Sequence, residues 1–196
     1  MRKSTAALAA ASLIVITALA LAGCTSWFES PGKPANDAIE VANGHLQTAA
    51  SIDATVSASA ASLQTVPYTK TGAKDALKLT ASIATALAGE RKELTAAKAA
   101  MDGIADLEVD AALKEYAALE STSIDARIAL ADGEARLYAA LDRLFNSLSG
   151  ALKGVDDQEM ITAIQAMQQE VTALGESASA AAKTASDYFA TNRLGG

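Results

Sequence analysis

The fold is decided by residues 73–101, which read AKDALKLTASIATALAGERKELTAAKAAM. Apolar and small side chains recur in this stretch at intervals of three and four residues or their sum, which places them on one face of an α-helix. The residues on that face are Ala76, Thr80, Ile83, Leu87, Leu94, Ala97 and Met101. The stretch therefore predicts one long amphipathic helix, and Asp102 and Gly103 are expected to end it.

The same spacing predicts three further helices on either side of this one. They cover residues 36–64, residues 105–148, and a last segment that begins after Asp156 as its N-cap. No proline follows Pro67, and alanine, the strongest helix former, supplies 48 of the 196 residues. The fold class is therefore all-α, an antiparallel up-and-down bundle of about four long helices that forms one domain over residues 37–190.

Some details of this bundle are left open by the sequence. The segment 105–148 bends or splits if Gly133 weakens it, and within it Asp132 and Arg136 have the favourable i,i+4 spacing for an ion pair. Ser-Ala-Ser-Ala-Ala occurs at 57–61 and again at 177–181, in the first and last helices. We expect those two helices to be neighbours, with small residues that permit a close approach.

The first 23 residues have a composition of their own. Arg2 and Lys3 precede an alanine- and leucine-rich apolar run, which ends in Leu21-Ala22-Gly23-Cys24. A short basic start, an apolar run and a small-residue exit are the layout of a secretory signal peptide. The alternative is an uncleaved transmembrane anchor, because residues 5–23 are just long enough to span a bilayer.

The tetrapeptide at 21–24 resembles the lipobox of bacterial lipoproteins, and the resemblance covers the first 24 residues. It implies that a signal peptidase cleaves between Gly23 and Cys24, and that Cys24 Sγ receives a diacylglyceryl group and becomes the lipid-carrying N-terminus. The chain would then bind the membrane through its lipid anchor, since two or three acyl chains give stable attachment. Residues 24–36, which contain Pro31, Gly32 and Pro34, are expected to form a flexible tether, and 191–196 a flexible tail.

The resemblance also implies a location. The protein would lie on the extracytoplasmic face of the cell membrane. In a Gram-negative cell the outer membrane is the other possibility, because Thr25 rather than aspartate follows the cysteine.

Charge and residue usage exclude several functions. The formal net charge is −7, and about −9 once Arg2 and Lys3 are removed with the signal peptide. A body this acidic is repelled by nucleic acid, so no nucleic-acid partner is expected. His45 is the single histidine and Cys24 the single cysteine, which argues against a metal site, a cofactor and thiol catalysis.

The sequence raises two sharper chemical possibilities. The acidic run from Asp102 to Asp110 lacks the spacing, central glycine and terminal glutamate of a calcium loop. His45 on the first helix could ligate haem together with Met160 or Met167 on the last helix, but an alanine-rich helix favours tight packing over a haem pocket. Neither possibility supports an enzyme, so the chain is interpreted as non-enzymatic.

Two functional classes remain. The first is a structural or protein-interaction lipoprotein of the cell envelope, with an envelope protein as its partner. The alternative is an extracytoplasmic module that binds a small molecule, peptide or lipid between its helices, where Tyr116, Tyr138, Tyr188 and the methionines would line the site.

Overall fold

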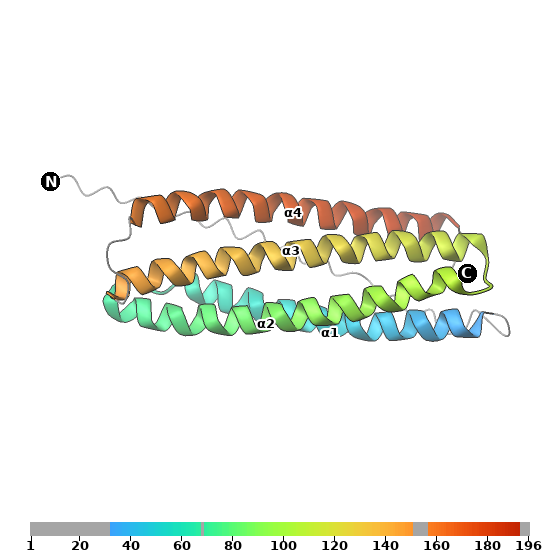
Figure 1. Ribbon diagram of the computed structural model, residues 1–196, viewed down its shortest axis with the longest axis horizontal. Coiled ribbons are helices and arrows are strands. Elements are labelled where there is room, and N and C mark those ends of the chain that lie inside the picture. Colours follow the sequence, from blue (N-terminus) through green and yellow to red (C-terminus); the bar gives the residue numbers. More distant parts are fainter. Residues whose placement is uncertain (1–31, 68, 151–156, 193–196) are drawn as a thin grey trace.

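The computed structural model describes residues 32–67, 69–150 and 157–192. The helices in these ranges are α1 (Lys33–Gln64), α2 (Lys70–Asp102), the short 3₁₀ helix η1 (Gly103–Asp106), α3 (Ala111–Ser149) and α4 (Asp157–Thr191). No strand occurs in the described ranges, and successive long helices run in opposite directions along an elongated bundle (Figure 1). The predicted all-α, up-and-down architecture is confirmed.

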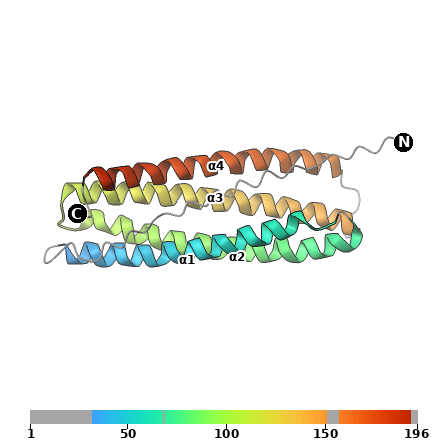
Figure 2. The ribbon, with the colours of Figure 1, turned by 180° about the vertical axis from the view of Figure 1, so that it is seen from behind.

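The helices form an open array rather than a closed ring. Close backbone contacts join α1 to α2, α2 to α3 and α3 to α4, whereas none joins α1 to α4 over their described residues. Figures 1 and 2 place α1 and α4 on opposite sides of the bundle in both views. The expected neighbourhood of the first and last helices is therefore wrong, and the repeated pentapeptides at 57–61 and 177–181 lie on helices that do not meet.

The reason for this arrangement is that α3 has two apolar faces. One face packs with α1 and α2, and the other carries Leu137 and Leu144, which pack with Ile164 of α4. Gly133 lies on the face toward α4, where a Cβ atom would lie only 2.7 Å from Leu174 Cδ1. The missing side chain thus lets α4 approach α3 closely.

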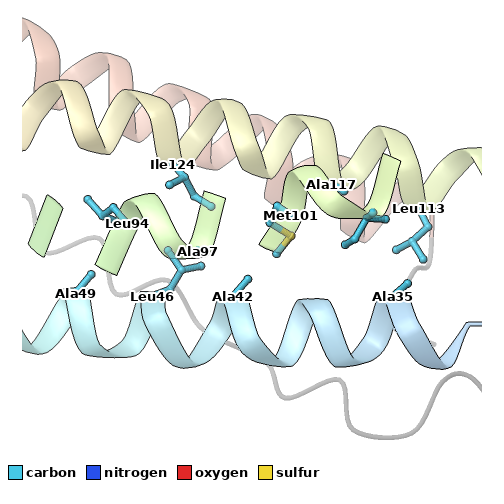
Figure 3. Close-up of a cluster of buried hydrophobic side chains, with 11 residues drawn as sticks. Ala35, Ala42, Leu46, Ala49, Leu94, Ala97, Met101, Leu113, Ala117 and Ile124 are labelled. Carbon is cyan, nitrogen blue, oxygen red and sulfur yellow. The ribbon is translucent and has the colours of Figure 1, made fainter. Parts of the chain in front are cut away.

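The largest part of the core lies where α1, α2 and α3 meet near η1. Alanines supply most of the α1 side of this cluster, and longer side chains of α2 and α3 pack against them (Figure 3). Leu94, Met101 and Ile124 are each at most 1% exposed. Burying one such side chain stabilises the fold by about 1.5–3 kcal/mol. The buried members from the three helices and η1 are Ala35, Ala42, Leu46, Ala49, Leu94, Ala97, Met101, Ile104, Leu113, Ala117 and Ile124.

The observed helix bounds differ from the predicted ones at two places. Helix α1 begins at Lys33, with Gly32 as N-cap and Pro34 in its first turn, so it includes residues 33–36 that were assigned to the tether. Proline is compatible with the first turn because the N–H that it lacks would have no partner in the helix there. Helix α3 is one continuous helix, but it begins at Ala111 rather than at residue 105, because η1 precedes it.

The expected pairing of Asp132 with Arg136 is also wrong, because each side chain has a partner on another helix. Asp132 Oδ1 lies 2.8 Å from Arg91 Nε of α2, and Arg136 pairs with Glu170 of α4. The two ion pairs therefore connect α3 to both of its neighbours. None of the helices within the described residues has a segment that is apolar enough to cross a membrane.

Candidate functional site

The residues that carry the lipoprotein resemblance, Gly23 and Cys24, lie outside the described residues, as does most of the expected tether. The other candidate from the sequence, His45, lies on α1. Its Nδ1 atom is 2.7 Å from Oε2 of Glu93 on α2, and both side chains are partly exposed. Met160 and Met167 belong to α4, which packs on α3 and on neither α1 nor α2 within the described residues. The structure therefore does not bring His45 together with either methionine.

The acidic run of residues 102–110 lies at the end of α2 and around η1. Asp102 accepts hydrogen bonds from Lys98 of its own helix and from Ser121 of α3. The bond from Lys98 has the larger effect and the bond from Ser121 the smaller one, and both lower the pKa of the Asp102 carboxyl. Its side chain thus joins α2 to α3, and the described residues contain no group of three or more acidic, histidine or cysteine side chains arranged to hold a metal ion.

The tyrosines named for a ligand site do not converge on one cavity. Tyr116 packs against Phe189 of α4, with 5.2 Å between the ring centroids. Tyr138 packs instead against the cluster of Val56, Ile83 and Leu87. A shallow hollow does lie on the bundle, but it is lined by small side chains of α1 together with Leu79 of α2. No tyrosine lines it.

A feature that the sequence reasoning missed lies in the middle of the bundle. Asp53 of α1, Glu90 of α2, and Arg127 and Glu134 of α3 interact electrostatically across the three helices. We call these four residues the central ionic layer. Apolar clusters lie on both sides of it along the bundle axis. The layer holds three carboxyl groups and one guanidinium.

The periodicity of each helix explains how these charges reach the interior. On α2, Glu90 follows Leu87 by three residues and precedes Leu94 by four, so it occupies a core position of a heptad pattern. On α1, Asp53 has the corresponding place between Ala49 and Val56. The α3 members of the pattern are spaced by seven residues and belong to the series Leu113, Glu120, Arg127, Glu134 and Leu141.

The burial of the layer is uneven. Glu90 is 6% exposed, and Glu120, one heptad before Arg127, is 7% exposed. Arg127 Nη2 lies 3.9 Å from Glu90 Oε1, which is an ion pair without a close hydrogen bond. Asp53 and Glu134 are half-buried. One partly buried guanidinium thus faces more carboxyl groups than it can neutralise.

Burial and the excess of carboxyl groups together raise the pKa values in the layer. Burial, and then the charge of Asp53, raises the pKa of Glu90 to about 7, although Arg127 acts in the opposite direction. Burial, and then the charges of Glu90 and Asp53, raises the pKa of Glu134 to about 7. Burial also raises the pKa of Asp53. A buried carboxyl group binds its proton more tightly because the charged form loses its hydration.

The effect extends to two neighbours of the layer. Burial, and then the charge of Glu134, raises the pKa of Tyr138 to about 12. Burial raises the pKa of Glu120, against the opposing effect of Arg127. Carboxyl groups with a pKa of about 7, such as those of Glu90 and Glu134, can bind and release protons near neutral pH. Because these groups lie in a helix interface rather than in a cavity, the chemistry that the arrangement supports is proton binding coupled to packing.

The sequence contained a signal for this layer. Glu90 follows Leu87 by three residues and precedes Leu94 by four. The apolar spacing therefore marks residue 90 as a core position that holds a charged side chain. The face predicted for α2 passes from Leu87 to Leu94 without Glu90, because charged residues are rarely buried.

An elongated all-α bundle with an ionic layer in its interior is the class that these observations define. No family model, curated protein or solved structure matches this chain.

Proposed function

We propose that this protein is a lipid-anchored lipoprotein of the bacterial cell envelope and that its role is structural or protein-interacting rather than enzymatic. The observation that carries the proposal is the tetrapeptide Leu21-Ala22-Gly23-Cys24 directly after an apolar run. In this account the bundle is attached through lipid on Cys24, on the extracytoplasmic side of the membrane. Its attachment needs no basic surface, which suits its acidic composition.

The shape of the bundle supports an interaction role. Helix α3 has 39 residues and is therefore about 58 Å long. Because the helices form an open array with no contact between α1 and α4 over their described residues, each of these two helices leaves its outer face for a partner. Val41 on α1 is 52% exposed, which is unusual in a bundle whose other large apolar side chains are mostly covered. A rod with two free edges is a suitable shape for a spacer or adaptor between envelope components.

Site-specific photocrosslinking in living cells tests this proposal. A photoreactive amino acid would replace Val41 on the α1 edge or Glu176 on the α4 edge of the full chain, since both side chains are exposed. The control is the same pair of variants with Cys24→Ser, which cannot receive the lipid. We expect a discrete crosslinked species from at least one edge that is lost with Cys24→Ser. Absence of any discrete species from both edges, with the protein present in the membrane fraction, would contradict the interaction role.

A further inference from the structure

The central ionic layer has more negative than positive groups, and its position in the fold makes that imbalance important. Glu90 is packed between α1 and α3, because α4 does not contact α2 in the described residues. The charged groups that face it are Asp53 from α1, and Arg127 and Glu134 from α3. If all four groups were charged, the layer would carry a net charge of −2 inside a helix interface.

A buried interface does not hold such an excess of charge without a cost. The guanidinium of Arg127 is 3.9 Å from the Glu90 carboxylate. At this distance the attraction offsets less of the free energy that both ions lose when they leave water. Proton uptake by a carboxyl group removes both the repulsion and most of that loss. In the unfolded chain the same carboxyl groups are hydrated and far apart, so they bind protons less tightly.

We propose that the central ionic layer is a proton-dependent stability element: the bundle takes up protons there when it folds, and its helices hold together more strongly as the pH falls from about 8 to about 5.5. The proposal concerns the packing of α1, α2 and α3 and does not depend on the lipid anchor. Its test and the test of the proposed function can therefore fail separately.

The direction of the pH dependence follows from the pKa values of the folded and the unfolded chain. The pKa of Glu90 lies at about 7 in the folded chain against an ordinary value of 4.5, and Glu134 has the same shift. Between those two values the folded state binds more protons than the unfolded state. Stability therefore falls as the pH rises from 4.5 to about 7. The stabilising contribution of the bound protons is complete only near the lower of these two values.

A contact outside the layer contains the chain's single histidine, with His45 Nδ1 2.7 Å from Glu93 Oε2, and imidazoles as a class change charge within this range of pH. The pH dependence of the natural protein alone would therefore not identify its source. The comparison between variants of the layer and variants outside it does.

The experiment is thermal unfolding of the full chain in a non-ionic detergent, followed by circular dichroism at about pH 5.5 and about pH 8. We expect the Tm of the natural protein to be higher at the lower pH by at least about 4 °C. Glu90→Gln and Glu134→Gln should each remove a large part of this difference, and the double variant most of it. The matched control is Glu115→Gln, an exposed position on α3. It should leave the difference unchanged, while His45→Gln measures the histidine contribution.

Two outcomes would overturn the proposal. One is a natural protein whose Tm at about pH 5.5 is equal to or below that at about pH 8. The other is a pH dependence that Glu90→Gln and Glu134→Gln leave intact while His45→Gln removes it. If Glu90→Gln failed to fold, the half-buried Glu134→Gln variant would decide between these results, because its amide has access to water.

Discussion

The guanidinium of Arg127 faces the carboxylate of Glu90 across the α2–α3 interface, with 3.9 Å between Nη2 and Oε1. Arg127 is the one cation in the central ionic layer, and it also opposes the raised pKa of Glu120, one heptad away. A single side chain thus moderates the charge of several buried acids. The stability of the bundle should depend on it more than on an ordinary surface arginine.

Replacing this arginine is the first prediction. Arg127→Met keeps an unbranched side chain that can still pack between the helices but removes the charge, so the layer loses its only cation. We expect the free energy of unfolding to fall by about 2 kcal/mol at pH near 8, and by less near pH 5.5, where Glu90 and Glu134 are largely protonated. Urea unfolding at both pH values measures the change. Arg143→Met, at an exposed position on the same helix, is the control, and an equal loss in both variants would contradict the role of Arg127.

The turn between α1 and α2 provides the second prediction. A Cβ atom on Gly72 would lie 2.0 Å from the backbone oxygen of Pro67, which cannot move without changing the turn. The N–H of Gly72 also donates to Thr69 Oγ1, the N-cap of α2. We expect Gly72→Ala to destabilise the bundle by about 2 kcal/mol or more.

The matched control is Gly44→Ala in α1. No atom lies within 4 Å of the corresponding Cβ position, so this variant should gain about 1 kcal/mol from helix propensity alone. Thermal or urea unfolding of the two variants gives changes of opposite sign if the turn is built as described. A neutral Gly72→Ala variant would show that the turn has another conformation.

The contact between α3 and α4 provides the third prediction. Alanine at Gly133 and alanine at Gly175 gain the same helix propensity, but a Cβ at Gly133 lies 2.7 Å from Leu174 Cδ1, whereas one at Gly175 has no neighbour within 4 Å. The difference between the two variants therefore isolates the close approach of α4. We expect Gly133→Ala to be less stable than Gly175→Ala by about 1 kcal/mol. Equal stabilities would mean that α4 does not pack on α3 at this point.

Most of the fold could be predicted from the sequence because helix formation depends on local periodicity. The continuity of the apolar stripe on α2 follows directly from residues three and four apart, and the end of α1 at Gln64 follows from the helix-breaking stretch around Pro67. The order of the helices in space could not be predicted in this way. It depends on the use of two different faces of α3, and the apolar spacing along one helix does not show which partner covers each face.

The side-chain partners show the same limit. Asp132 and Arg136 fit the local rule for an ion pair, yet the contacts with Arg91 and Glu170 on neighbouring helices are the ones formed. The burial of Glu90 is not predicted for a related reason, since the rule that charged residues are exposed ignores the heptad position of this residue. In both cases tertiary packing overrides a rule that considers one helix alone.

The proposed lipid anchor depends on Cys24, and metabolic labelling with radioactive palmitate measures its modification in cells that express the full chain. We expect a labelled protein in the membrane fraction and an unlabelled Cys24→Ser variant. A natural protein that carries no label, or a Cys24→Ser variant that is labelled equally, would contradict the lipid anchor.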